Sequence, residues 1–248
     1  DLRFDNKDLR MHGVFGPIVL KVDYAQAQGA DMVVPLNIRW SSVVMDYDPC
    51  GSVDDDVEHK RLAIWRNDFR NQTIATDAAK YSDDTQVLIT VDTLEHALNL
   101  KRLLPGYTLV YMENGMTASR KAKAVKEGFI KDSEPEMTLA RRAKLTKGFE
   151  TGELKKVIAT TVWNVGVSFN NLQVLIRGDG GGSSINDIQI PGRVSRIAEG
   201  KTKGIVHDYL DQFNYRYKLR AKKRAASYAA NSWEQTFPRT SMLSEYLK

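Results

Sequence analysis

The stretch QVLITVDTLEHALNLKRLLPGYTLVYM, residues 86–112, sets the rhythm of this 248-residue chain. Its first part, 86–91, predicts a buried parallel strand, because a continuous apolar run of this length suits a strand covered on both faces. The segment 93–104 predicts the helix that follows, and a Pro-Gly pair ends it. Residues 108–112 predict the next strand. This order is typical of an open, mainly parallel α/β sheet with helices on both faces.

The same alternation continues on either side of this stretch. Further strands are predicted at 155–163, 172–177 and 203–210, with charged helical sequence up to about residue 149. Upstream, the sequence predicts two short strands near 18–22 and 33–40, an acidic loop at 46–56, and one or two helices over 54–81. We therefore divide the chain into a lead-in of strands and helix (1–80), an α/β lobe (81–212) and a basic, aromatic, helical C-terminal extension (213–248).

The composition excludes several classes of protein. Hydrophobic residues make up 42% and charged residues 27%, which is ordinary for a globular protein. No apolar run reaches about 18 residues and no signal peptide is recognisable, so we expect a cytoplasmic protein without a membrane partner. The single cysteine, Cys50, cannot form an internal disulfide, and four scattered histidines offer no zinc-ligand spacing. We therefore expect no structural metal.

The modest positive charge of +5 is concentrated near the C-terminus. YRYKLRAKKRA at 215–225 contains six cations and no acid. One interpretation is that this segment follows a phosphate backbone while nearby aromatic residues stack on bases. The other is that the aromatic residues pack on the lobe and the cations face water. Under the first interpretation the nucleic-acid-binding residues are Lys218, Arg220, Lys222, Lys223 and Arg224.

QIPGRVSRI at 189–197 carries Arg193 and Arg196 at positions i and i+3. On a helix these would share one face, where two guanidinium groups can grip a polyphosphate. Ser184 and Asp187 predict that a helix begins near 184, and the Pro-Gly pair at 191–192 predicts that it is short or irregular. The alternative is a solvated basic helix face.

The surrounding sequence resembles a known family. ATTVWNVGVSFNNL at 159–172, followed by a strand and by Q-x-x-G-R-x-x-R, resembles motifs V and VI of superfamily 2 helicases in order and spacing. The segment 87–104 resembles motif IV. Residues 15–38 and 65–91 are similar to the sequence between the two RecA-like lobes of phage UvsW-type helicases and their XPB-like relatives. The resemblance covers roughly residues 11–212 and implies a RecA-like second helicase lobe.

The resemblance implies roles for individual residues. Arg193 and Arg196 would reach the γ-phosphate of ATP, which the first lobe holds with Mg²⁺, and Gln189 would help to orient them. Gly166 would let the loop approach the nucleotide, and Ser168 stands where the family often has an acid near the ribose. Thr160 would contact the nucleic-acid backbone. For Thr160 and Gly166 the alternative is a buried strand end and a turn.

Besides Ser168, the chain departs from the family in the spacing between two of its motifs. The Gly-Met-Thr turn at Gly115 and the spacing of Arg142, Phe149 and Gly152 fit, but about twenty extra residues lie between them. We interpret residues 118–136 as an insertion, which either touches nucleic acid or is a solvated helical excursion. Gly200-Lys201-Thr202 mimics the end of a Walker A loop, but position 195 is Ser195 where that motif needs glycine, so we predict a turn. GDGGGSS at 178–184 is interpreted as a mobile loop that borders the ATP cleft.

Neither a Walker A sequence nor a DExH box is found in the chain. We therefore expect the second motor lobe of a larger ATP-dependent DNA helicase or translocase, with RNA as another possible substrate. Its partner would be the N-terminal RecA-like lobe, and the chain alone would not hydrolyse ATP. The chain begins without methionine, which fits a fragment. The alternatives are a non-catalytic nucleic-acid-binding protein with the same fold, and a regulatory lobe that supplies its arginines to another ATPase.

Overall fold

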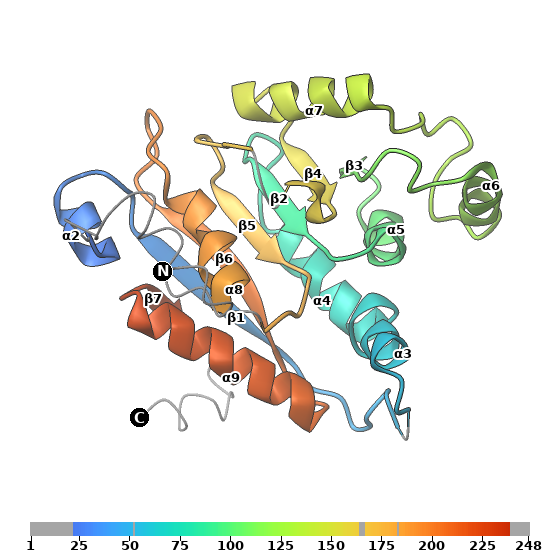
Figure 1. Cartoon of the computed structure of the whole chain (residues 1–248), viewed down its shortest axis with the longest axis horizontal. Coiled ribbons are helices and arrows are strands. Elements are labelled where there is room, and N and C mark those ends of the chain that lie inside the picture. The colour runs from blue at the N-terminus through green and yellow to red at the C-terminus, as the bar shows by residue number, and fades with distance from the viewer. Residues whose placement is uncertain (1–21, 52, 164–166, 183, 239–248) are drawn as a thin grey trace, which may run out of the picture.

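The computed structural model describes residues 22–51, 53–163, 167–182 and 184–238. Within these ranges seven strands form one sheet in the order β3-β4-β2-β5-β6-β1-β7, and every neighbouring pair is parallel (Figure 1). The strands are β1 (Leu36–Val43), β2 (Val87–Thr90), β3 (Thr108–Val110), β4 (Lys156–Ala159), β5 (Val174–Arg177), β6 (Gly204–Asp211) and β7 (Glu234–Thr236). The predicted parallel α/β sheet is confirmed. The strand expected near 18–22 falls almost entirely outside the described residues.

Helices connect the strands. They are α2 (Tyr24–Gly29), α3 (Asp56–Lys60), α4 (Asp68–Ala78), α5 (Leu94–Leu103), α6 (Ala118–Lys126), α7 (Leu139–Thr151), α8 (Ser184–Gln189) and α9 (Tyr215–Ala230). A π-helical turn η1 (Arg61–Trp65) and two 3₁₀ turns, η2 (Thr161–Trp163) and η3 (Pro191–Ser195), complete them. Local sequence fixes several starts: the Thr93 hydroxyl accepts the backbone N–H of His96 at α5, and Thr138 accepts that of Arg141 at α7.

Both faces of the sheet are covered, as the sequence predicts. In β2, Val87 and Ile89 belong to the core that includes residues of α4 and α5, whereas Leu88 belongs to the core that includes residues of α7, η3 and α9. The alternation follows from the two-residue period of a strand. In Figure 1, α8 and α9 cross one face of β5, β6 and β1. The apolar continuity of the central strands therefore reflects burial from two sides.

The sheet takes strands from all three sequence ranges. β1 pairs with β6 along its whole length, from Leu36 opposite Gly204 to Val43 opposite Asp211. β7 extends the edge by pairing with β1. The helical extension that the sequence predicts is present as α9, but the strand β7 was not predicted. Its three residues have no strand pattern, and tertiary contacts hold them, including a 2.9 Å hydrogen bond from Trp40 Nε1 to Gln235 Oε1.

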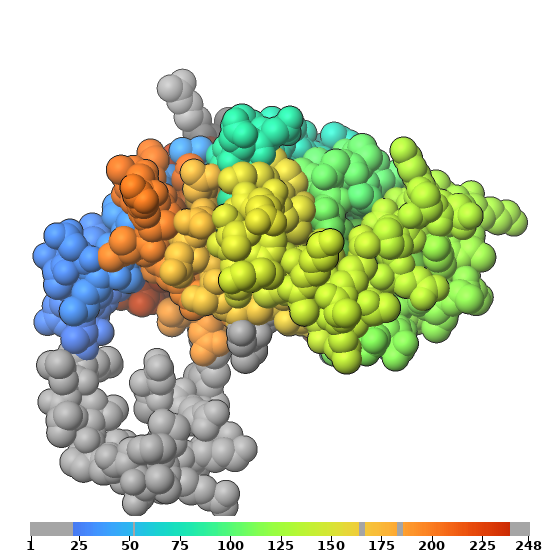
Figure 2. Space-filling model, turned by 90° about the horizontal axis from the view of Figure 1, so that it is seen from above, coloured from blue at the N-terminus to red at the C-terminus, as the bar shows by residue number. Residues whose placement is uncertain are grey.

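The interpreted insertion, 118–136, contains α6 and the connection to α7. Ala124 and Ile130 pack into the core beneath α5, so the segment is attached to the lobe through its own side chains. Figures 1 and 2 show α6 and α2 near opposite ends of the long axis of the molecule. This segment is therefore a packed helical arm at the β3 side of the sheet, and its status as an insertion stays a prediction.

A substitution in the central strand tests the two-sided core. Ile176 in β5 is fully buried, so Ile176→Ala should lower the free energy of unfolding by about 2–5 kcal/mol. Val57→Ala in α3, where the side chain is 54% exposed, should change it by less than about 0.5 kcal/mol. Urea denaturation followed by circular dichroism measures both. Equal effects would contradict the assigned burial.

Candidate functional site

The segment that carries Arg193 and Arg196 is a turn followed by extended backbone. α8 ends at Gln189, and after Ile190 the chain forms the 3₁₀ turn η3 with Pro191 at its first position. Pro191 and Val194 are buried, which anchors the turn. Arg196 lies beyond the turn with φ −64° and ψ 141°. The expected irregularity is confirmed, but the two arginines do not share one helix face.

Both arginines contact the connection between β4 and β5, residues 160–173, which we call the crossover loop. An Nη1 of Arg193 donates to the carbonyl oxygen of Trp163. An Nη1 of Arg196 donates to the hydroxyl oxygen of Ser168. The structure thus brings together Ser168 and the two arginines, which the sequence assigned to one site.

The other predicted site residues of this region are less involved. Gly166 lies outside the described residues. Gln189 is exposed at the end of α8. Thr160 follows β4 and is only 6% exposed, and its backbone N–H donates to the carbonyl of Val110 at 2.9 Å. A nucleic-acid contact by the Thr160 side chain would therefore require movement of the crossover loop.

Aromatic packing holds the crossover loop against α7. Trp163 and Phe169 of the loop meet Phe149 of α7, with ring centroids 4.8 to 5.3 Å apart. Trp163 Nε1 also donates to Thr146 Oγ1 at 3.0 Å. The backbone carbonyl of Trp163, which accepts from Arg193, therefore belongs to a residue whose side chain is held against α7. Sequence reasoning gave these aromatics no role in supporting the site, although two of them stand inside the segment that resembles motif V.

The site concentrates positive charge. Burial, together with the nearby charge of Arg196, lowers the pKa of Arg193. The same two causes lower the pKa of Lys201 to about 8. Within the described part of the chain, neither Arg196 nor Lys201 forms an ion pair with a carboxylate. A surface of this kind favours an anionic ligand.

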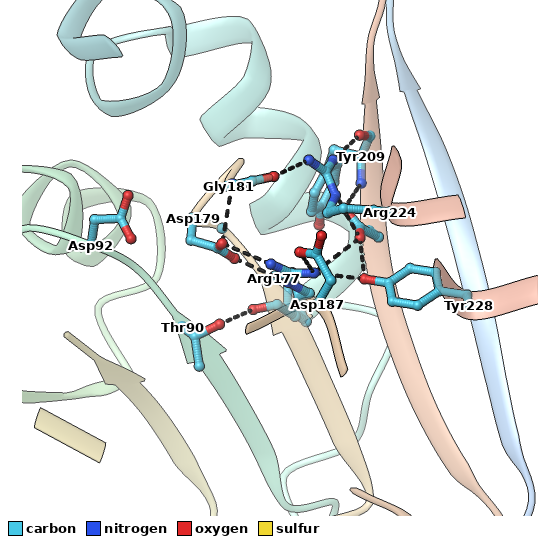
Figure 3. A network of polar contacts seen from close by, with 12 residues as sticks. Thr90, Asp92, Arg177, Asp179, Gly181, Asp187, Tyr209, Arg224 and Tyr228 are labelled. Carbon is cyan, nitrogen blue, oxygen red and sulfur yellow. Dashed lines mark hydrogen bonds and ion pairs between the residues drawn. The ribbon is translucent and has the colours of Figure 1, made fainter. Parts of the chain in front are cut away.

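A buried polar network at the end of β5 includes Asp187 of α8, the helix that precedes the arginines (Figure 3). Arg177, at the end of β5, donates to both oxygens of Asp179 at 3.2 and 2.9 Å, to Asp187 at 3.0 Å and to the Tyr228 hydroxyl at 2.7 Å. Although burial opposes it, the Asp179 and Asp208 carboxylates raise the pKa of Arg177. Since Asp187 belongs to α8, this network attaches the helix that precedes the arginines to the centre of the sheet.

Arg224 is part of the same network, which contradicts the nucleic-acid-binding role that the sequence suggested for it. Its Nε donates to the Asp208 carboxylate at 3.0 and 3.1 Å, and its other nitrogens donate to the carbonyls of Gly181 and Tyr209 at 2.6 and 2.9 Å. The side chain is 1% exposed. It therefore serves inside the fold, and the nucleic-acid contact suggested by the sequence is not available to it.

The other cations of α9 remain at the surface. Lys222 and Lys223 are exposed, while Lys218 and Arg220 are half-buried. The Arg220 guanidinium lies 5.0 Å from the centre of the Tyr217 ring. Of the aromatics that could stack on bases, Tyr215 is 76% exposed, whereas Tyr217, Tyr228 and Trp233 are buried. The interpretation of aromatics packed on the lobe thus holds for most of them.

The glycine loop, residues 178–182, is held in place by buried arginines. Arg70 donates to the Gly178 carbonyl at 2.8 Å, and Arg224 holds that of Gly181. Gly180 has φ +57°, a left-handed conformation that favours glycine, and a Cβ there would meet the Ile64 side chain at 2.7 Å. The N–H groups of Gly178 and Gly181 donate to Thr90 and Asp179. These hydrogen bonds hold the first part of the loop in the fold, and the mobility of the whole segment 178–184 stays a prediction.

A groove of about 880 Å³ lies between α5, α6 and η1. Its cations are largely matched by acids: Arg61 and Arg66 contact Glu95, and Arg102 contacts Asp68. It is therefore less suited to an anion than the arginine site. The described residues contain no group of three or more His, Cys, Asp or Glu side chains that could hold a metal ion. None of the described helices is long and apolar enough to cross a bilayer.

Comparison with known proteins identifies the family of this fold and site. The family described as "Helicase conserved C-terminal domain" matches residues 71–198, more than half of the chain. The chain belongs to this family of helicase C-terminal domains. It is 24% identical over 233 residues to a protein assigned as helicase 22 of Sulfolobus islandicus filamentous virus (isolate Iceland/Hveragerdi), covering 90% of this chain and 38% of that protein.

Solved structures share the fold. A fragment assigned as the HsdR subunit of a type I restriction enzyme from Vibrio vulnificus YJ016 matches with a TM-score of 0.62 at 16% identity, over 96% of this chain and 42% of that one. T4 UvsW matches with a TM-score of 0.53 at 16% sequence identity, over 82% of this chain and 40% of that one. S. cerevisiae Dbp5 bound to RNA and ADP BeF3 matches with a TM-score of 0.55 at 13% sequence identity, over 99% of this chain and 51% of that one. The chain thus spans about half or less of each of these proteins.

Neighbouring residues of α9 allow a matched test of the buried network. Arg224→Ala leaves the Asp208 carboxylate buried without its main partner, so it should lower the free energy of unfolding by about 3–5 kcal/mol. Lys223→Ala, at an exposed site, should change it by less than about 0.5 kcal/mol. Both are measured by chemical denaturation. A mild effect of Arg224→Ala would show that its charge is not needed inside the fold.

Proposed function

We propose that this chain is the second motor lobe of a larger ATP-dependent superfamily 2 DNA helicase or translocase. The observation that carries the proposal is the convergence of Arg193, Arg196 and Ser168 on the crossover loop. It is supported by the absence of a carboxylate partner for Arg196 among the described residues. Because Arg196 forms no ion pair with a described carboxylate, its guanidinium can bind an external phosphate without first breaking such a pair.

The residues present suit the phosphate end of ATP and not the magnesium ion. Guanidinium groups match phosphate oxygens in fork geometry, whereas Mg²⁺ requires carboxylate or other oxygen ligands, and the described residues near the arginines supply no cluster of them. ATP and Mg²⁺ would be held mainly by the N-terminal lobe. The part of Arg193 and Arg196 would be to stabilise negative charge that develops on the transferring phosphoryl group.

Nucleic acid would be the second ligand. Lys222 and Lys223 form an exposed basic edge on α9, flanked by Lys218 and Arg220. Such an edge can follow a phosphate backbone without reading its sequence. The same edge would serve the alternative function, a nucleic-acid-binding protein without catalysis. The two functions differ in whether the arginine site is needed.

ATP hydrolysis by the protein that joins this lobe to its N-terminal lobe tests the arginines. Arg196→Ala and Arg193→Ala should each reduce DNA-stimulated turnover by about 10³-fold or more, because each removes charge from the transition state. Lys203→Ala, at a nearby exposed lysine, should retain turnover. Wild-type rates in both arginine variants would exclude the catalytic role and leave the binding function. The isolated lobe should not hydrolyse ATP.

DNA binding by the chain tests the basic edge. Exchanging Lys222 and Lys223 together for alanine should weaken binding and reduce the slope of log affinity against log salt by about 0.7–0.9 for each phosphate that the side chains no longer neutralise. Lys147→Ala, at an exposed position of α7, is the control for loss of charge. Fluorescence anisotropy at several salt concentrations gives the slopes. Equal slopes in the variant and the control would remove α9 from the nucleic-acid surface.

A further inference from the structure

A turn at residues 198–201 contains the first two residues of the Walker A-like sequence Gly-Lys-Thr, and it gives Lys201 a role of its own. Gly200 adopts φ +72°, a left-handed conformation that favours glycine. The N–H of Lys201 closes the turn on the carbonyl of Ala198 at 3.1 Å. The reversal sends the Lys201 side chain back toward the arginine site.

The Lys201 ammonium bridges the two segments of that site. Its Nζ donates to the carbonyl oxygen of Arg196 at 2.9 Å and to the carbonyl oxygen of Asn170 at 3.1 Å. Asn170 belongs to the crossover loop, two residues after Ser168. One side chain therefore joins the backbone of Arg196 to the loop that carries the partner of the Arg196 guanidinium.

Arg196 needs such an attachment. It lies beyond η3 in extended conformation, so no helical hydrogen bond fixes its position. Its guanidinium contacts Ser168, which is itself exposed. Without a second tie, the guanidinium would follow the movements of a surface loop.

A lysine is an unfavourable choice if these two bonds are its whole role. Burial and the charge of Arg196 both disfavour its protonated form, and no described carboxylate pairs with it. A neutral donor could reach carbonyl oxygens without this repulsion. The Lys201 ammonium lies near the charge of Arg196 and uses two of its three N–H groups on backbone carbonyls. Its third N–H group is left as a donor for an incoming anion.

We propose that Lys201 is a positioning residue that clamps Arg196 to the crossover loop and completes a three-cation site for the phosphate groups of a nucleotide. The identity of the anion rests on the proposed function. The clamp itself is a property of this chain and can be tested without the N-terminal lobe.

The test compares Lys201→Met with Lys203→Met in the full chain. Both remove one positive charge, two residues apart, but Lys203 is exposed. Hydrogen–deuterium exchange should rise at 167–173 and 193–198 in Lys201→Met and stay at the wild-type level in Lys203→Met. Affinity for tripolyphosphate should fall about tenfold in Lys201→Met, as expected for loss of a charge-assisted contact, and less than about twofold in the control.

A milder variant and the arginine variants complete the design. Lys201→Gln keeps N–H donors but no charge, so it should show intermediate exchange and replaces Lys201→Met if that variant does not fold. Unchanged exchange, or unchanged tripolyphosphate affinity, at Lys201 overturns the inference. If exchange rises while Arg193→Ala and Arg196→Ala bind tripolyphosphate as the wild type does, the clamp stands and the proposed phosphate role of the arginines fails.

Discussion

The elements around the arginine site depend on the hydrogen bonds and ion pairs of one buried carboxylate, that of Asp208. It accepts from Arg224 Nε and from the Tyr228 hydroxyl, and it lies 3.8 Å from Arg177. Removing a charge from water costs several kcal/mol, and only close partners and further hydrogen bonds offset that cost. The network therefore has little tolerance for rearrangement. β5, β6, α8 and α9 meet at this point in one arrangement.

This arrangement explains why an irregular segment can carry precise side chains. η3 is short and Arg196 is extended, so the local backbone has little stiffness of its own. The stiffness comes from both sides: Asp187 ties α8 to Arg177, and the aromatic cluster of Trp163, Phe169 and Phe149 holds the crossover loop. A functional group is placed well when its supporting residues are themselves fixed. Here the support comes from the core of the sheet and from α7.

Much of the fold was predictable because periodicity reports burial. The central strands and the helix α5 have patterns that few other structures would satisfy, and they were placed to within a few residues. The strand β7 could not be predicted, because its pairing depends on β1, which is distant in sequence. The candidate site residues were proposed from motif spacing, which locates a segment but not its surroundings. Spacing could not reveal that Arg224 turns inward while Lys223 turns outward, since that depends on the rotation of α9 against the sheet.

The pairing of β1 with β6 has a consequence for how the protein is made. Leu36 pairs with Gly204 and Val43 pairs with Asp211. β1 therefore cannot form its ladder until β6, more than 150 residues later in the sequence, has been synthesised. Sheets built from such distant partners fold slowly, because the entropy of closing the intervening loop is lost before any contact compensates for it. During synthesis the apolar residues of β1 (Leu36, Ile38, Trp40 and Val43) would lack their β6 partner until residues 204–211 have left the ribosome. β1 is therefore a strand whose apolar residues need protection from aggregation while the chain grows.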